Sequence, residues 1–168
     1  NPYTGKLNFA GWKNKIVVYG ADGKFDHIWT PAIPAGQFPA MAAFDYLDAD
    51  LIAGYYSATD SLPARIALFR GDEIVRVESL LTEQKGEGVI TPNDIASISV
   101  LKDGGDGLVI MKYKDDKSAV YSLGNSCFWH TGKDLYFRQS YNDTIYQVSA
   151  VKELQPARVL DLGAHRWP

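Results

Sequence analysis

Short runs of β-branched and aromatic residues recur from one end of the chain to the other, with Gly, Asp, Asn or Pro between them. Asp22-Gly23 separates the runs 15–20 and 25–29, and such a dipeptide favours the tight primed turn of a β-hairpin. Gly71-Asp72 and the glycine-rich stretch 103–107 separate two further pairs of runs in the same way. The pattern predicts about twelve to fourteen short strands joined by hairpin turns.

Evidence for helices is weak. The alanine-rich stretch 38–46 is the best candidate, but Pro39 stands near its start and β-rich sequence follows it. This stretch therefore allows either a short turn of helix or a strand that begins near Ala42. The sequence predicts an all-β protein in both cases.

Length and composition exclude several classes of protein. The chain has 168 residues, which fits one domain, and its formal net charge is −3 with both signs interspersed. No basic face is expected to bind nucleic acid, no apolar run is long enough for a membrane span, and the N-terminus does not have the shape of a signal peptide. Cys127 is the single cysteine, so an internal disulfide is excluded, and its apolar neighbours favour an inert, packed thiol.

An internal repeat favours a propeller among the all-β folds. The segments 15–30 and 64–79 both consist of strand, polar turn and strand, and two more strands precede the second segment. A four-stranded unit of roughly 45 residues is the size of one propeller blade, although a simple meander with accidental similarity is the alternative. The predicted fold is a β-propeller of four-stranded antiparallel blades, with about three and a half to four blades in residues 1–168.

The blades are assigned by counting strands. Ile16–Thr30 would end one blade, Ala42–Leu80 would form a complete blade, and Ile95–Gly163 is too long for one blade and short for two. The strand near residues 126–130 could belong to either of the last two blades. A chain of this kind is either a compact propeller or the C-terminal part of a larger one. Open strand edges would then favour self-association or association with the rest of the propeller.

The candidate ligand-binding residues are Trp129, His130, Arg138 and Tyr141. Aromatic side chains and an arginine at the mouth of a channel could hold a sugar or a peptide by stacking and bidentate hydrogen bonds. The adjacent tyrosines Tyr55 and Tyr56 could add to the same face. The turn Asn142-Asp143 is interpreted as a structural corner, because Asn and Asp close Asx turns onto their own backbone.

Metal and catalytic chemistry have little support in the sequence. The three histidines are far apart and lack the spacing of zinc ligands. The stretch 103–107 lacks the alternating oxygen ligands of a calcium loop, so it is interpreted as a turn. We predict no catalytic residue, no metal and no cofactor.

The segment from Leu135 to Pro168 contains "NDTIY", then Leu154 and Pro156, then "VLDLG". It resembles a signature of six-bladed β-propeller proteins of Bacteroides-type bacteria, which are related to the NHL and TolB-like propellers. The stretch "NKIVVYGADGKF" is similar to a hairpin of NHL-type blades. The resemblance implies an exported protein in the periplasm or on the cell surface, in many cases a lipoprotein anchored through a preceding segment. It carries over no catalytic motif.

The predicted fold and the resemblance are compatible with three hypotheses for the function. The first is a non-catalytic propeller module that binds a protein or a glycan outside the cytoplasm. The second is a propeller enzyme, lactonase-like or lyase-like, that uses a metal. The third is a structural subunit of an envelope complex.

Overall fold

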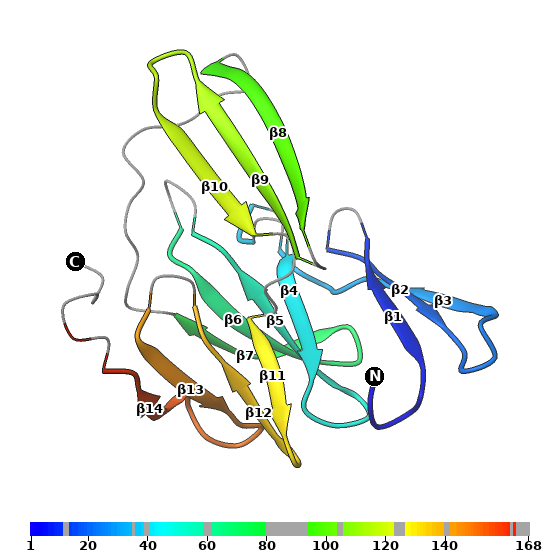
Figure 1. The fold of residues 1–168 in the computed structure, drawn as a ribbon. Helices are drawn as coiled ribbons and strands as arrows, with labels where there is room; N and C mark the ends of the chain where they lie inside the picture. The colour runs from blue at the N-terminus through cyan, green and yellow to red at the C-terminus, as the bar shows by residue number, and fades with distance from the viewer. Residues whose placement is uncertain are drawn as a thin grey trace. The chain divides into compact units, whose positions relative to one another are not determined.

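The computed structural model describes residues 1–11, 14–34, 36–38, 41–58, 62–79, 94–103, 106–122, 127–139, 142–161 and 163. These residues form fourteen strands in four antiparallel sheets and contain no α-helix (Figure 1). The prediction of an all-β fold is confirmed for this part of the chain. None of its segments is a helix with the length and apolarity needed to cross a membrane.

The chain divides into two compact units. The first unit comprises residues 1–83 and 127–168, and the second comprises residues 84–126. The second unit contains one three-stranded sheet, with β9 (Asp106–Tyr113) between β8 (Ile95–Asp103) and β10 (Ser118–Ser122). The β8–β9 ladder continues to the pair Asp103–Asp106, so the hairpin predicted around residues 103–107 is confirmed.

Three sheets make up the first unit. The N-terminal sheet consists of β1 (Leu7–Ala10), β2 (Ile16–Tyr19) and β3 (Phe25–Trp29). The central sheet consists of β4 (Met41–Tyr46), β5 (Leu51–Tyr56), β6 (Arg65–Arg70) and β7 (Glu73–Ser79). The C-terminal sheet consists of β11 (Phe128–Thr131), β12 (Asp134–Phe137), β13 (Thr144–Val148) and β14 (Gln155–Val159). In all three sheets the strands are in sequence order.

Most of the strands and turns lie where the sequence predicts them. Gly23 and Gly71 have positive φ angles of 77° and 59° in the turns after β2 and β6, where glycine avoids the steric cost of a Cβ atom. The ambiguous stretch before Tyr46 is strand β4. The strand near residues 126–130 is β11 and belongs to the C-terminal sheet, which settles that alternative. The prediction missed β1, because Leu7–Ala10 is a short segment with no hairpin dipeptide after it.

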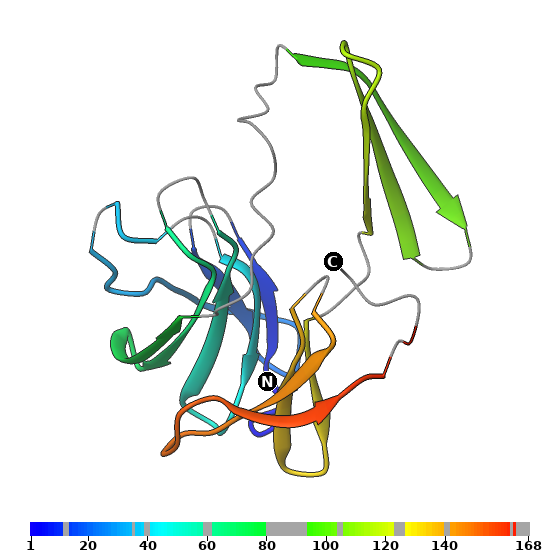
Figure 2. The same ribbon diagram turned by 90° about the vertical axis from the view of Figure 1, so that its left-hand side faces the viewer.

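The central sheet is covered on both faces. Leu51, Ala53 and Tyr55 of β5 belong to one buried cluster, which joins the central sheet to the C-terminal sheet. The intervening residues Ile52 and Tyr56 belong to a second cluster, which joins the central sheet to the N-terminal sheet. Successive side chains of a strand point to opposite faces, so a strand covered on both sides is apolar at every position. The continuous run "LIAGYY" therefore fits a strand between two other sheets (Figure 2).

Side-chain hydrogen bonds also link the central sheet to the C-terminal sheet. Arg76 of β7 donates from its guanidinium to the carbonyl oxygens of Ser149 and Ala150, in the connection between β13 and β14. The Nε atom of Arg76 lies 2.7 Å from Oε1 of Glu78. The arginine thus holds the outermost strand of the central sheet to a loop of its neighbour.

The N-terminal sheet leaves an apolar face uncovered by the other sheets of the first unit. Ile16 and Val18 point to the central sheet, so Val17 and Tyr19 point away from it. The ladder places Leu7 and Phe9 beside them on one side, and Phe25 and Ile28 on the other. Phe9 is 55% exposed and Phe25 is 60% exposed. We call this surface, formed by Leu7, Phe9, Val17, Tyr19, Phe25 and Ile28, the outer apolar face.

Candidate functional site

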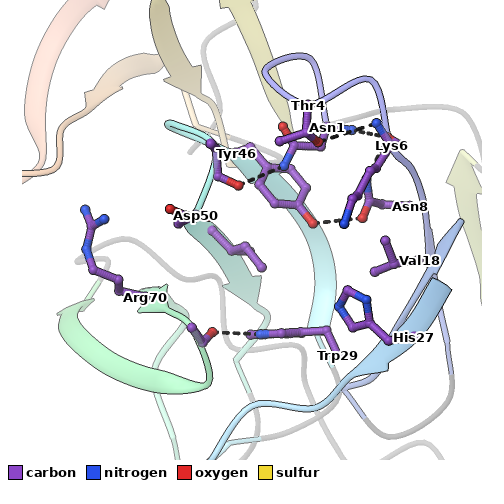
Figure 3. A pocket seen from close by; sticks show the side chains of 13 residues that line it. Asn1, Thr4, Lys6, Asn8, Val18, His27, Trp29, Tyr46, Asp50 and Arg70 are labelled. Carbon is purple, nitrogen blue, oxygen red and sulfur yellow. Dashed lines mark hydrogen bonds between the residues drawn. The ribbon is translucent and has the colours of Figure 1, made fainter. Parts of the chain in front are cut away.

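A pocket of about 420 Å³ lies between the N-terminal and central sheets (Figure 3). It is lined by the segment before β1, one side of the N-terminal sheet, the end of β4, the start of β5 and the turn after β6. The lining residues are Asn1, Thr4, Lys6, Asn8, Val18, His27, Trp29, Tyr46, Ala49, Asp50, Ile52, Arg70 and Gly71. Its volume is in the range of small-molecule sites. We call it the inter-sheet pocket.

The floor of the inter-sheet pocket is apolar and rigid. Val18, Ile52 and Tyr46 are buried members of the cluster between the two sheets. The Trp29 ring packs edge-on against Phe69, with 5.4 Å between ring centroids, and its Nε1–H donates to the carbonyl oxygen of Gly71 at 2.7 Å. The indole therefore has a fixed position, and one of its faces is turned to the pocket (Figure 3).

A chain of hydrogen bonds fixes the polar wall. The Tyr46 hydroxyl donates to Oδ1 of Asn8 at 2.9 Å, and the Asn8 amide donates to the carbonyl oxygen of Lys6 at 2.9 Å. The Asn1 amide donates to the carbonyl oxygen of Ala49 at 3.1 Å, which links the N-terminal segment to the β4–β5 turn. Burial raises the pKa of Tyr46 to about 12, and the negative charge of Asp45 adds to the shift. The phenol therefore stays protonated and keeps donating to Asn8 at neutral pH.

The cationic side chains at the rim each have an acidic partner. Nζ of Lys6 lies 2.6 Å from Oδ2 of Asp26, and Nη2 of Arg70 lies 3.4 Å from Oδ2 of Asp48. Asp48 also caps the β4–β5 turn, because its Oδ1 accepts the backbone N–H groups of Asp50 and Leu51 at 2.8 and 2.7 Å. Desolvation acts to raise the pKa of Asp48, but these two N–H groups and Arg70 together hold it below its usual value.

Among the predicted site residues, His130 has side-chain contacts outside its own sheet. Its Nε2 atom lies 3.3 Å from Oδ1 of Asp45 on β4, and its ring meets the edge of Tyr3 with centroids 6.1 Å apart. Asp45 and Tyr3 were not predicted, because they reach His130 only through the packing of separate segments. The described residues contain no group of three potential metal ligands, here or elsewhere.

Trp129 lies on the opposite face of the C-terminal sheet from His130. The two residues are neighbours on β11, and neighbours on a strand point to opposite faces. Trp129 stacks on Tyr136, with ring centroids 6.1 Å apart and an angle of 21° between the planes. A single ligand on one face of the sheet would therefore not contact both side chains.

Arg138 follows β12, and its backbone N–H donates to the carbonyl oxygen of Cys127 at 2.9 Å. Tyr141 lies outside the described residues. Trp129, His130 and Arg138 thus do not form one constellation, and the ligand-binding role of each of the four residues stays a prediction.

The corner at Asn142 and Asp143 has the predicted structure. Oδ1 of Asn142 accepts the backbone N–H of Thr144 at 2.8 Å, which closes an Asx turn before β13. The carbonyl oxygen of Asp143 accepts the N–H of Leu160 at 2.8 Å and so ties the corner to the end of β14. Neither residue has a positive φ angle. The corner therefore depends on the side-chain acceptor of Asn142 and does not require a left-handed backbone conformation.

The suggestion that Tyr55 and Tyr56 line a binding face is wrong. Tyr55 is 8% exposed and Tyr56 is 0% exposed, and they lie in the two different buried clusters. The only cysteine, Cys127, packs against the cluster that contains Tyr55. Burial raises the pKa of the Cys127 thiol, and the nearby Arg138 charge opposes this shift. The interpretation of Cys127 as a packed thiol agrees with this position.

The described residues define an all-β fold, and the antiparallel sheets of its first unit pack face to face. The chain belongs to the family described as Domain of unknown function (DUF4934), which matches residues 1–168. No curated protein matches the chain at a significant level.

One solved structure is similar to the chain, a protein from Bacteroides fragilis that carries the provisional description "exported protein". The two chains are 14% identical with a TM-score of 0.36, a similarity too weak to assign a fold. The match covers 94% of this chain and 49% of the other chain, so this chain spans about half of the length of that protein.

Sequence reasoning missed the inter-sheet pocket altogether. Its walls come from segments that are far apart in the sequence, and no local motif marks them. Trp29, for example, looks like an ordinary aromatic residue of a β-hairpin until the turn after β6 supplies its hydrogen-bond acceptor. The pocket exists only after the two sheets have packed together.

Proposed function

We propose that this chain is a non-catalytic binding module, built as part of a β-propeller, and that it acts outside the cytoplasm. The observation that carries the binding function is the inter-sheet pocket. Its floor is held by core packing, and its polar wall is held by hydrogen bonds between the protein's own groups. A pocket that is already formed needs little ordering when a ligand enters, which favours affinity.

Two features support the propeller. The three sheets of the first unit have their strands in sequence order and pack face to face, as the blades of propellers do. The outer apolar face would be covered by a further sheet in such an arrangement, which gives its exposed phenylalanines a role. We propose that the missing sheets belong to the rest of a six-bladed, NHL-like or TolB-like propeller. We also propose export and a lipid anchor, because the resemblance of the segment from Leu135 to Pro168 to such propellers implies both.

The ion pairs at the rim fit a pocket that orients a ligand. Lys6 and Arg70 are the lysine and arginine of its lining, and both are engaged with carboxylates. The ion pairs hold these side chains in place, from where they can orient a ligand by hydrogen bonds.

Ligand-dependent stabilisation tests the binding function. Thermal unfolding would be measured with separate panels of neutral saccharides and short peptides, followed by mass spectrometry of any compound that stabilises the protein. A ligand present at a hundred times its Kd should add about 2.7 kcal/mol to the free energy of unfolding. The compound should be recovered chemically unchanged.

Matched variants locate the site. Asp50→Ala and Arg70→Ala at the pocket rim should reduce the stabilisation, whereas Asp115→Ala and Arg158→Ala should leave it intact. Conversion of the ligand into a product would contradict the proposal, and so would equal effects of the rim and control variants.

A further inference from the structure

We infer that the inter-sheet pocket binds an uncharged saccharide of one or two rings rather than a peptide or an anionic ligand. This inference rests on the binding function proposed above and specifies the ligand class.

The floor suits the apolar face of a sugar ring. The C–H groups on one side of a pyranose form a flat patch that packs well on an aromatic face. Trp29 supplies such a face, and its ring is held in place by the T-shaped contact with Phe69 and by the hydrogen bond from its Nε1–H to the Gly71 carbonyl oxygen. Val18 and Ile52 extend the apolar surface next to the indole.

The balance of charges argues against an anionic ligand. The two strong cations of the rim, Lys6 and Arg70, face Asp26 and Asp48 at ion-pair distance. Asp50 adds a further negative charge to the lining. A phosphate or carboxylate would therefore meet little net positive potential, whereas an uncharged ligand pays no such penalty.

The polar groups of the rim suit hydroxyls. No partner for the Asp50 carboxylate is found in the part of the chain that the structure describes, so its two oxygens can accept from neighbouring hydroxyls. The contact of Arg70 with Asp48 uses one Nη atom, which leaves further N–H donors on the planar guanidinium. Planar groups of this kind can bind a pair of adjacent hydroxyls in a bidentate manner.

A peptide fits this pocket less well. Extended peptides bind strongly when they add a strand to an exposed sheet edge, where backbone groups supply the hydrogen bonds. The inter-sheet pocket lies between sheet faces, and most of its polar groups are side chains on separate segments. Donors and acceptors distributed in this way favour a compact ring with hydroxyls around its rim.

Isothermal titration of the full chain tests the inference. The probes are a panel of neutral mono- and disaccharides of glucose, galactose, mannose, xylose and N-acetylglucosamine, with their uronic acid counterparts and short neutral peptides as separate arms. We expect at least one neutral saccharide to bind, and Asp50→Ala or Arg70→Ala to weaken that binding about tenfold or more. Asp115→Ala and Arg158→Ala, which change exposed residues outside the pocket, should leave it unchanged.

The indole N–H resonance of Trp29, assigned with the variant Trp29→Phe, gives a second readout that does not depend on folding of the rim variants. It should shift on addition of the saccharide, while the resonance of Trp129 should not. Binding only by the peptide or uronic acid arm, with the same dependence on Asp50 and Arg70, would overturn the saccharide inference and leave the binding function intact. Absence of binding in every arm would overturn both.

Discussion

The contact between the central and C-terminal sheets depends on aromatic rings, and its energy can be measured. Phe137 of β12 is 0% exposed, and its ring centroid lies 5.0 Å from that of Tyr55 on β5 and 5.0 Å from that of Phe128. Truncation of such a residue to alanine typically costs about 3–5 kcal/mol. Since whole domains are stable by about 5–15 kcal/mol, leucine is the safer substitution at both positions.

The perturbation is a double-mutant cycle of Tyr55→Leu and Phe137→Leu. Leucine preserves an apolar side chain and removes the ring, so the cycle isolates the ring–ring contact from general burial. An aromatic pair contributes about 0.5–1.5 kcal/mol beyond its buried area, and this is the expected coupling energy. Urea unfolding monitored by near-ultraviolet circular dichroism, which reports on packed aromatic rings, measures all four proteins of the cycle.

A control cycle pairs Tyr55→Leu with Ile16→Val. Ile16 belongs to the other buried cluster, on the opposite side of the central sheet. The two substitutions should be additive within about 0.3–0.5 kcal/mol. If the Tyr55–Phe137 cycle is also additive within that margin, the two sheets do not pack through these rings and the stacked arrangement is refuted.

Three further predictions concern single sites. Asp48→Ala should cost about 1 kcal/mol in urea unfolding because it removes the acceptor of two turn N–H groups, while Asp48→Asn keeps that acceptor and should cost less. The depressed pKa of Asp48 means that its charge-dependent contribution is present above the pKa of the unfolded chain and is lost as the pH falls through the lower folded value. The stability of the unmodified protein should therefore converge on that of Asp48→Asn in acid, because both then carry an uncharged side chain at this position. Asn142→Ala should lower the free energy of unfolding by about 1 kcal/mol without reducing saccharide affinity. If the variant is as stable as the unmodified protein but no longer binds the saccharide, the corner is part of a binding site. The Cys127 thiol should react with iodoacetamide much more slowly in the folded protein than in urea, and equal rates would contradict its packed position.

A fourth prediction concerns the outer apolar face. Phe9→Ser and Phe25→Ser should reduce self-association of the chain in light scattering, because they remove exposed aromatic surface. Val151→Ser, which changes an exposed apolar residue of the β13–β14 connection, is the matched control and should have no effect. A monomer at every concentration for the unmodified chain would contradict this prediction.

The local sequence predicted most of the strands and turns, although not β1. Asp22-Gly23 and Gly71-Asp72 predict hairpin turns because glycine accepts a positive φ at low cost, and the structure has glycines with positive φ at both. The continuous apolar run of β5 and the alternation along β7 follow from burial on two faces and on one face, respectively. The corner at Asn142 was also predictable, since an Asx turn involves only residues close in sequence.

The tertiary structure alone decided which segments meet. Trp129 and His130 are adjacent in the sequence, but the pleat of β11 sends them to opposite faces, and His130 finds Asp45 from a distant strand. Tyr55 and Tyr56 look like a binding surface in the sequence, yet two sheets bury them on opposite sides. The inter-sheet pocket depends on the same packing. Turns and strand periodicity are local, so a few neighbouring residues predict them. A site consists of side chains from several strands, and their relative positions depend on how whole sheets pack.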